Sequence, residues 1–514
     1  MRIAALDLGT NSFHLLVADV QPDGHFEPIA AEKAMLRLGD VVSREGRITE
    51  PAAEVMIATI RRFRLLAEAA GATELHACAT SAVRSAANGD EIVDRIEAET
   101  GVRVEVISGH REAELIFGAI RASVVLEPAP ALCFDLGGGS VEIMVGDSSG
   151  LTLAASEPLG VGRLTAGFVH SDPISKHDRH ALRDHIAEIL APIAARVAEL
   201  EPKLVVGSSG TLEDLARMAA ATRDANVPLS LNQLTFTHDE FLPLHRQIIA
   251  STADERLRME GLETRRVDLI AAGSTFLATA MELFGFEEMT VSEWALREGI
   301  VLDAIGRHDP VDWSDDPRAI RRASVLGLAR RCQWPEEHAR HVARLALELF
   351  DQTTELHGLG ADERELLEFG AYLHDIGEHV ASQGHHKHGA YLVRHGQLRG
   401  FDPDDVQMLA AMARWHRRGE PKATDELPLV DADRLRALVA LLRLADGLDR
   451  GRAGAVEHVD VRVGPSLVVV EIETAGDAEL ELWGARRKRD LFEKVFGRDL
   501  ELVIPPVRDM TDLT

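Results

Sequence analysis

Alternating apolar and polar positions near residue 135 predict a β-hairpin with a glycine turn. An apolar run at 131–136 includes Asp135, the glycines of 137–139 and Ser140 follow, and apolar residues alternate again over 141–145. This pattern is typical of a strand, a tight turn and a second strand. A turn without bulky side chains lets backbone N–H groups converge on an anion, and Ser140 can add a hydroxyl donor. Asp135 at the strand end is suited to hold a divalent cation directly or through water.

A second copy of this pattern lies at the start of the chain. Residues 3–17 form an apolar run that reaches Asp7, passes Gly9 and hydroxyl residues, and then resumes. A single glycine turn after a strand usually has only a structural role. A repeat of the turn about one domain-length away favours a common function for the two turns. We therefore predict two similar α/β lobes that face each other across a cleft, each offering a phosphate loop.

The first lobe, predicted to span residues 1–125, places two charged side chains just after strands. Arg84 follows a buried strand at 75–80, and Glu112 lies in the first turn of a helix that follows a strand at 102–107. Arg84 could reach a phosphate, although an exposed loop arginine is an equally good interpretation. An acidic residue in a first helical turn is also the ordinary choice of the helix dipole. Neither residue alone identifies a site.

The second lobe, predicted to span residues 126–305, contains a further anion-binding pattern. A strand that begins at 204 runs into the Gly/Ser turn of 207–211, which opens a helix at Leu212. The N-terminus of a helix is a favourable position for an anion. The lobe continues with an apolar helix preceded by Arg265 and Arg266, and residues 292–300 close it. A linker is then marked by Pro310, Trp313 and Pro317.

The rest of the chain changes character. Residues 311–455 have helical spacing and are rich in histidine, and residues 456–514 predict a small α+β domain. Its expected elements are strands at 459–463, 467–472, 479–482 and 500–504 and a helix through Phe492 and Phe496. The basic run of 486–489 is normally a solvated helix face, but in an acidic protein it could instead flank a channel for a long polyanion.

Composition excludes several classes of protein. With 514 residues and 46% hydrophobic content, the chain can bury several cores, and three or four domains are expected. No apolar run approaches membrane-spanning length and no leader precedes the first strand, so we expect no membrane partner and a cytoplasmic location. The three cysteines lack metal-ligand spacing, which fits a reducing compartment. A formal net charge of −28 argues against nucleic acid as a partner but not against an anion held in a metal-assisted cleft.

The ordered set of motifs resembles the exopolyphosphatase / guanosine pentaphosphate phosphohydrolase family. The motifs are the turns at 7–12 and 135–142, the segment Ser108-Gly109…Glu112-Ala113, the turn at 207–211 and Leu296-Arg297-Glu298-Gly299. The resemblance implies an α/β fold with two actin-like (ribonuclease H-like) lobes. We expect an all-α HD-like domain and the small α+β domain to follow them.

The same resemblance assigns roles to particular residues. It implies that Glu112 is the general base that activates a water, and that Glu142 and Asp135 position water and Mg²⁺, with Asp7 as a further cleft ligand of the metal. The implied phosphate-binding residues are Asn11, Ser12, Arg84, Gly137, Gly138, Gly139, Ser140, Ser209, Gly210 and Thr211. Relatives often have another acidic residue just before the base, where this chain has Arg111.

The third region resembles HD-domain metal-dependent phosphohydrolases. A lone histidine on an apolar helix face is usually a core residue, but this region offers His341, then His374-Asp375, then Asp446 in the order of that family's ligands. His385 and His416 stand where relatives with two metals place extra ligands. The resemblance implies a divalent metal such as Mn²⁺ or Fe²⁺, with a catalytic, regulatory or structural role left open.

These observations predict a Mg²⁺-dependent exopolyphosphatase that releases orthophosphate from inorganic polyphosphate, with direct attack by water. The closest alternative is removal of the 5′-terminal phosphate of guanosine pentaphosphate, a reaction of the stringent response. A polyphosphate or nucleotide sensor with a metal-binding HD domain is an alternative of another class. An ATPase or sugar kinase is disfavoured because only the weak turn at 272–274 could hold adenosine. The resemblance also implies a homodimer.

Overall fold

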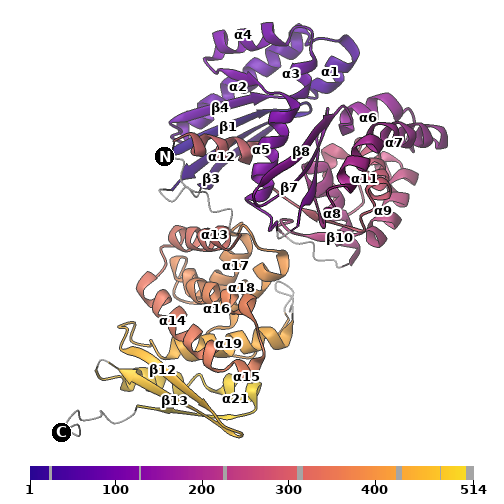
Figure 1. Cartoon of the computed structure of the whole chain (residues 1–514). Helices are drawn as coiled ribbons and strands as arrows, with labels where there is room; N and C mark the ends of the chain where they lie inside the picture. The colour runs from indigo at the N-terminus through magenta and orange to yellow at the C-terminus, as the bar shows by residue number, and fades with distance from the viewer. Residues whose placement is uncertain are drawn as a thin grey trace. The chain divides into compact units, whose positions relative to one another are not determined.

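The computed structural model describes residues 1–21, 26–126, 129–223, 229–308, 317–423, 431–474 and 476–504. The chain divides into two compact units, Met1–Ile320 and Arg321–Thr514, and each is described by itself (Figure 1). The finer division at residues 125, 305 and 455 remains a prediction. Of the expected linker, Pro310 and Trp313 lie outside the described residues, and Pro317 begins a helix.

The first sheet of unit one has the order β3-β2-β1-β4-β5. Its strands are β1 (Arg2–Leu8), β2 (Ser12–Val20), β3 (Phe26–Met35), β4 (Glu74–Ala79) and β5 (Val104–Val106). The first three strands form an antiparallel meander, whereas β4 and β5 continue the sheet in parallel. The predicted hairpin at the start of the chain is therefore β1 and β2, with residues 9–11 as its turn.

The second sheet repeats this topology. Its order is β10-β11-β9-β6-β7-β8, so β8-β7-β6-β9-β11 corresponds to β3-β2-β1-β4-β5. The strands are β6 (Ala131–Leu136), β7 (Val141–Asp147), β8 (Gly150–Glu157), β9 (Leu204–Ser208), β10 (Thr235–Thr237) and β11 (Glu288–Val291). Strands β6, β7 and β8 are antiparallel neighbours, and β9 and β11 extend the sheet in parallel. The duplicated α/β lobes predicted from the sequence are confirmed.

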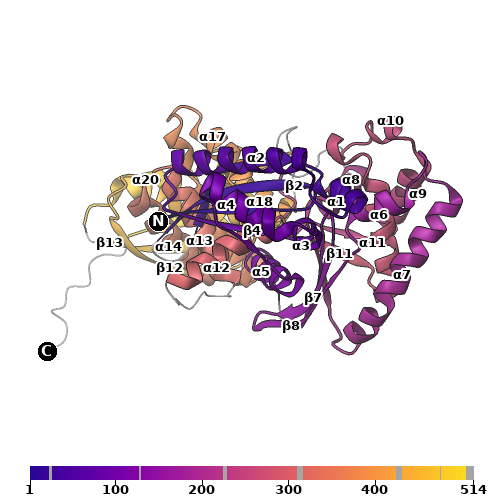
Figure 2. The ribbon, with the colours of Figure 1, turned by 90° about the horizontal axis from the view of Figure 1, so that it is seen from above.

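Alternation along β1 sends its side chains to two different cores. Ala4, Leu6 and Leu8 pack with helix α2 (Glu50–Ala69), which runs beside β2 in Figure 2. Helices α1 (Leu38–Glu45), α3 (Ser81–Ser85) and α4 (Gly89–Thr100) belong to the same side. Ile3 and Ala5 point the other way, toward α5 (Gly109–Arg121) and α12 (Leu296–His308). The two faces of the sheet are therefore both covered.

Helices α5 and α12 join the two lobes. Their core also contains Ala131, Cys133 and Met144 from the second sheet, so this helical layer lies between the two sheets. Helix α12 packs against α5 and β1 although the sequence analysis grouped it with the second lobe. Because α5 is shared, its N-terminus with Glu112 is held between the lobes.

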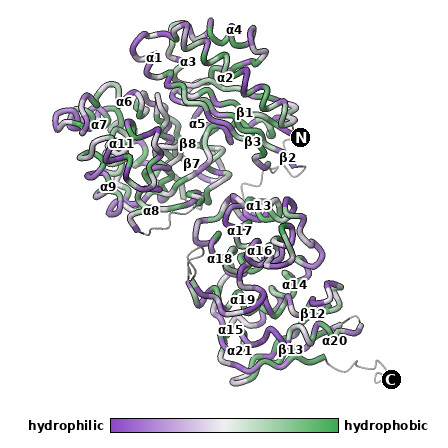
Figure 3. The backbone as a smooth tube through the Cα atoms, turned by 180° about the vertical axis from the view of Figure 1, so that it is seen from behind, coloured by the Kyte–Doolittle hydropathy of each residue, from purple (hydrophilic) through white to green (hydrophobic). Residues whose placement is uncertain are grey.

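The opposite face of the second sheet is covered by helices α6 (Val161–Phe168), α7 (Lys176–Ala198), α8 (Gly210–Arg223), α9 (His238–Ala250) and α11 (Ile270–Phe284), with short turns α10 (Ala253–Arg256) and η1 (Thr264–Arg266) nearby. Along α7, hydrophilic and hydrophobic segments alternate in Figure 3, as expected for a helix with one face in the core and one in solvent. None of the described helices is both long and apolar enough to cross a membrane.

Unit two has one hydrophobic core that combines helices and a small sheet. Its helices are α13 (Pro317–Arg331), α14 (Glu336–Gln352), α15 (Thr354–His357), α16 (Ala361–Leu373), η2 (Ile376–His379), α17 (His385–His395), α18 (Pro403–Trp415) and α19 (Ala432–Gly447). A three-stranded sheet β12-β13-β14 follows, made of Val456–Val463, Leu467–Thr474 and Asp499–Val503. Helices α20 (Glu479–Arg486) and α21 (Asp490–Phe496) pack against α19.

The predicted strand at 479–482 is wrong, because these residues open helix α20. The Glu-Leu-Glu-Leu sequence alternates as a strand would, but tertiary packing decides the conformation. A Cβ atom on Gly447 would lie 2.7 Å from the Cα atom of Ala485, so the two helices approach closely at a glycine. The basic run that begins at Arg486 is therefore held beside α19.

Candidate active site

Two glycine-containing turns meet at one cavity of unit one. The turn after β1 and the turn after β6 both line this cavity of about 250 Å³. A Cβ atom on Gly138 would lie 2.5 Å from the amide group of Asn11, and one on Gly139 would lie 2.6 Å from the Thr10 hydroxyl. Glycine is therefore required for the two turns to approach each other.

Four carboxylates come to this region from different elements. Asp7 lies near the end of β1, Asp135 on β6 and Glu142 on β7, where Asp135 and Glu142 are directly paired across the ladder. Glu112 lies in the first turn of α5, whose N-cap residue Ser108 accepts a hydrogen bond from the Arg111 backbone N–H. Asp7, Glu112 and Asp135 line the cavity, whereas Glu142 is buried behind it.

Each carboxylate except Asp7 has a defined hydrogen-bond donor. Arg84 Nη1 donates to Glu112 Oε2 at 3.1 Å and to the Ile107 carbonyl at 2.8 Å. Ser208 Oγ donates to Asp135 Oδ2 at 2.6 Å, and Ser156 Oγ donates to Glu142 Oε1 at 2.8 Å. Oδ1 of Asp7 is buried without a hydrogen-bond partner. An orphaned carboxylate oxygen in a polar cavity is suited to an additional cation or water.

Burial dominates the acid–base properties of this group. It raises the pKa of Asp7 to about 8, with Glu112 and Asp135 adding charge repulsion. It raises the pKa of Asp135 to about 6 and that of Glu142 well above its usual range. It also raises the pKa of Glu112 to about 7, although Arg84 acts in the opposite direction. A carboxylate with a pKa near neutrality is suited to act as a general base.

The predicted phosphate-binding residues converge on the same cavity, with one exception. It is lined by Asn11, Ser12, the turn Gly137–Ser140, Ser209, Gly210 and Thr211, while Arg84 contacts Glu112 from outside the lining. Ser209 has a φ of 77°, and a Cβ atom on Gly210 would collide with the guanidinium of Arg266. This turn therefore brings the N-terminus of α8 against the cavity.

Several charged residues that line the cavity have no role in the expectations drawn from the sequence. They are Lys33, Glu213, Arg266, Arg297 and Glu298. Arg266 and Arg297 are ion-paired, the first with Asp214 and Glu263 and the second with Glu298. Both arginines occurred in segments that the sequence analysis singled out, but nothing in the local pattern shows that these segments reach the cleft.

The cleft carboxylates alone do not enclose a metal ion. Among the described residues, the sets of three or more His, Cys, Asp or Glu whose ligand atoms are close enough to share an ion both lie in unit two. Mg²⁺ is commonly held by one or two protein carboxylates together with substrate phosphates and water. The unpartnered Asp7 oxygen and the raised carboxylate pKa values fit such a partial site.

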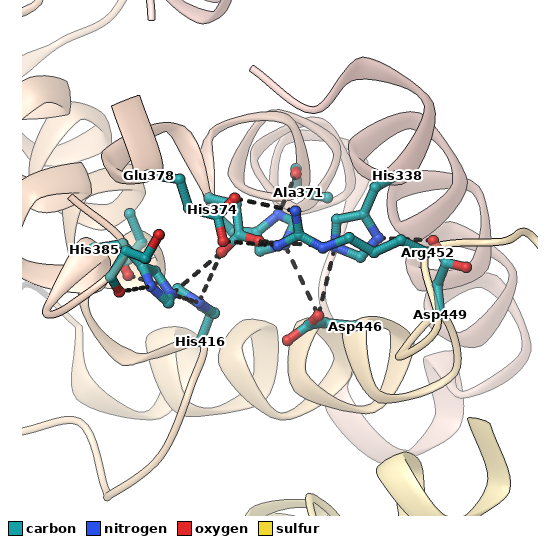
Figure 4. Close-up of polar contacts among 12 residues, drawn as sticks. His338, Ala371, His374, Glu378, His385, His416, Asp446, Asp449 and Arg452 are labelled. Atoms are coloured by element: carbon teal, nitrogen blue, oxygen red, sulfur yellow. Dashed lines mark hydrogen bonds and ion pairs between the residues drawn. The ribbon is translucent and has the colours of Figure 1, made fainter. Parts of the chain in front are cut away.

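The two sets in unit two are His338, His374 and Asp446, and Asp375, His385 and His416. The predicted ligand His341 belongs to neither set, and the histidine of α14 that the structure brings into the cluster is His338. His338 is buried among the ligands, whereas His341 lies beside Arg344 and near Gly454. The other five predicted residues are brought together (Figure 4).

Two actin-like α/β lobes and a cleft formed by phosphate-binding turns and buried carboxylates define a phosphoryl-processing protein. A family model described as the Ppx/GppA phosphatase family matches residues 16–308, and one described as Ppx/GppA phosphatase, domain III, matches residues 320–472. The chain therefore belongs to the Ppx/GppA phosphatase family, and it is a phosphohydrolase.

Individual relatives agree with this family. The curated protein Exopolyphosphatase 1 of Mycobacterium leprae is 37% identical over 307 residues, which cover 59% of this chain and 89% of that protein. The crystal structure of an exopolyphosphatase from Cytophaga hutchinsonii has a TM-score of 0.56 and 32% identity, covering 60% of this chain and 98% of that one. A Ppx/GppA family member from Aquifex aeolicus has a TM-score of 0.52 and 27% identity, covering 60% and 99%.

Proposed function

We propose that the chain is an exopolyphosphatase that hydrolyses the terminal phosphoanhydride bond of inorganic polyphosphate. The observation that carries this proposal is the position of Glu112, a buried carboxylate with a pKa of about 7 at a cavity formed by two phosphate-binding turns. The relatives named as exopolyphosphatases, which are matched over 89% and 98% of their own lengths, support polyphosphate as the substrate.

The proposed reaction needs a positioned water and stabilisation of charge on the phosphate oxygens. Glu112 accepts a proton from the water as the water oxygen bonds to the terminal phosphorus. The bridging P–O bond breaks, and the shortened chain leaves with the bonding electron pair on its oxygen. The turn at 137–140 and the N-terminus of α8 offer backbone N–H groups to the phosphates.

Asp7 and Asp135 would hold Mg²⁺ in this cleft, with Glu142 behind them. When bound, the ion supplies charge neutralisation for the phosphate oxygens. Ser208 and Ser156 keep Asp135 and Glu142 oriented by donating hydrogen bonds to one oxygen of each carboxylate. Action in the cytoplasm and assembly into a homodimer remain predictions.

Hydrolysis of the 5′-terminal phosphate of guanosine pentaphosphate is the second candidate, because the resemblance implies this reaction too and the description of the matching family names GppA beside Ppx. Both reactions use the same cleft chemistry, so substrate comparison separates them. Phosphate release from long-chain polyphosphate and from guanosine pentaphosphate should be measured in parallel with Mg²⁺. Turnover of the nucleotide alone would replace the main proposal.

The variant Glu112→Gln tests the base. Loss of about 10²–10⁴-fold in kcat is expected, since this is the usual contribution of a general base. Glu114→Gln is the matched control, because Glu114 lies in the same helix but pairs with Arg111 outside the cavity lining. Unchanged turnover in Glu112→Gln would overturn the assigned role.

A further inference from the structure

Four histidines of unit two present the same ring nitrogen to a common centre. Their Nδ1 atoms are held from behind by oxygen acceptors: His338 by Asp449 at 2.7 Å, His374 by the Ala371 carbonyl at 2.7 Å, His416 by the Ala413 carbonyl at 2.8 Å and His385 by the Ser382 carbonyl at 3.0 Å. These acceptors require a proton on Nδ1, which leaves the Nε2 lone pair free in each neutral ring. This arrangement is typical of imidazoles oriented as metal ligands.

The four Nε2 atoms differ in whether the protein offers them a hydrogen-bond partner. The Nε2 atoms of His338 and His374 are buried without a hydrogen-bond partner, and the two residues are 5% and 0% exposed. The Nε2 atoms of His385 and His416 lie 3.3 Å apart. Two neutral rings in this orientation would turn their Nε2 lone pairs toward each other. A cation bound by both nitrogens would remove the repulsion between these lone pairs. A histidine that serves only to pack a core is not expected to leave a buried Nε2 atom without a partner.

Asp375 lies between the two halves of the cluster, because its two carboxylate oxygens contact different pairs of histidines. Its Oδ2 is 3.6 Å from His374 Nε2 and 3.9 Å from His338 Nε2. Its Oδ1 is 3.4 Å from His385 Nε2 and 3.3 Å from His416 Nε2. One carboxylate oxygen thus faces each pair of histidines, which is the geometry of a carboxylate that bridges two metal ions.

Asp446 completes the first half of the cluster. Its Oδ1 is 3.7 Å from His338 Nε2 and 4.0 Å from His374 Nε2. The outer oxygen of Asp446 contacts Lys488, and Arg452 donates to Asp375 Oδ2 at 2.6 Å. These ion pairs partly neutralise the two carboxylates, and Arg452 does so at the Asp375 oxygen that faces His338 and His374. They do not account for the unpartnered nitrogens of His338 and His374.

The cluster opens into a cavity of about 390 Å³ with a basic lining. Arg417, Arg418 and Arg450 line it and have no carboxylate partner among the residues that the structure describes. Trp483 also lines it and is 49% exposed, with the Arg487 guanidinium 4.9 Å from its ring centroid. Unpaired arginines favour a phosphate, and an exposed indole favours a planar base. The volume is within the range of small-ligand sites.

We propose that unit two holds a second phosphohydrolase centre, in which two divalent metal ions bridged by Asp375 act on the phosphate ester of a nucleotide. A water oxygen bonds to phosphorus, the P–O bond to the ester oxygen breaks, and the water proton ends on that ester oxygen, giving an alcohol and phosphate from a nucleoside monophosphate or an alcohol and triphosphate from a nucleoside triphosphate. Trp483, Arg487 and Lys488 lie beyond residue 472, where the match to the family's domain III ends. The substrate side of this centre is therefore built partly by a segment that no comparison assigns.

Metal content is the first test, made on the full chain in the Glu112→Gln background and refilled with Mn²⁺. Elemental analysis should find two tightly held ions per chain, and Asp375→Ala should lose both. His385→Ala should retain one, because it leaves the His338, His374 and Asp446 set intact. His379→Ala is the control, since His379 is exposed in η2 next to the cluster. Equal metal content in all variants would overturn the proposal, and circular dichroism identifies any variant that does not fold.

Activity is the second test, with GMP, GTP and AMP as probes and Mn²⁺ present. Hydrolysis should persist in Glu112→Gln and fall at least 100-fold in Asp375→Ala and Asp375→Asn. Trp483→Ala should raise KM for the nucleotides about tenfold and leave kcat nearly unchanged. The catalytic proposal would be overturned if none of these nucleotides released phosphate or triphosphate in a Mn²⁺-dependent way. This result is independent of polyphosphate turnover, which depends on Glu112.

Discussion

Arg84 donates a hydrogen bond to Glu112, with 3.1 Å between Nη1 and Oε2, so the positive guanidinium group lies beside the carboxylate of the proposed base. Burial raises the pKa of Glu112 to about 7, and Arg84 is the main opposing influence. The same guanidinium nitrogen donates to the Ile107 carbonyl, which fixes its position. The protonation state of the base is therefore set by a competition between burial and one arginine.

Replacing Arg84 with Met should move the acid limb of the pH–rate profile to higher pH. Removing the positive charge leaves burial unopposed, so the pKa of Glu112 rises and the active carboxylate form appears later. At pH 7 we expect polyphosphate turnover to fall by about tenfold or more, with partial recovery at pH 9. The profile of kcat/KM against pH is the measurement. Arg61→Met is the control, because Arg61 pairs with Glu99 on the surface; a parallel loss at all pH values would show a purely structural role for Arg84.

Replacing Asp7 with Asn should stabilise the protein in alkaline solution without Mg²⁺. Because burial raises the folded-state pKa of Asp7 to about 8, the folded protein binds a proton more strongly than the unfolded chain. The folded state therefore loses stability relative to the unfolded chain as the pH rises from about 4 through 8. The uncharged Asn side chain removes this loss. We expect a gain of about 1–3 kcal/mol at pH 8 and almost none at pH 4.

Thermal unfolding at the two pH values measures this difference. Added Mg²⁺ should stabilise the wild type more than Asp7→Asn if Asp7 contributes to the cleft metal site. Asp184→Asn is the comparison, since Asp184 is exposed on α7. The assigned burial penalty would be contradicted if the wild type were more stable than Asp7→Asn at pH 8.

Replacing Gly138 with Ala should separate the two phosphate-binding turns. Its Cβ atom would lie 2.5 Å from the Asn11 amide, which is closer than carbon atoms approach without displacement. We expect at least a tenfold loss of polyphosphate turnover with a small effect on folding. The control is Gly167→Ala, because a Cβ atom there meets nothing within 4 Å. Steady-state kinetics and thermal unfolding of both variants distinguish a local displacement from a general loss of structure.

The sequence predicted the parts of the fold that are determined locally. Alternation and glycine turns located both hairpins, and the repeated pattern predicted the duplicated lobes. The docking of α12 and the helical state of residues 479–486 depend on neighbours distant in sequence. The same is true of Arg266 and Arg297, which reach the cleft only through the packing of the second lobe.

The choice between His338 and His341 shows how a helical pattern can mislead. Residues 341, 345 and 349 are spaced by four. Because an α-helix turns about 100° per residue, residues 341 and 349 point about 80° apart around the helix axis. Residues 338 and 349 are separated by eleven, which leaves them about 20° apart on the same face. His338 is accordingly buried with Leu345 and Leu349, whereas His341 is partly exposed.

His338→Ala and His341→Ala therefore make a matched pair within one helix. We expect His338→Ala to reduce the affinity of unit two for Mn²⁺ by about 10–100-fold or more, because it removes a ligand whose Nε2 is directed at Asp446 and Asp375. His341→Ala should bind Mn²⁺ as the wild type does. Isothermal titration of Mn²⁺ into the Glu112→Gln background gives both affinities, and elemental analysis gives the stoichiometry. If His341→Ala weakens binding and His338→Ala does not, the sequence-based assignment of His341 is correct and the geometry of the cluster is not that of the metal-bound protein.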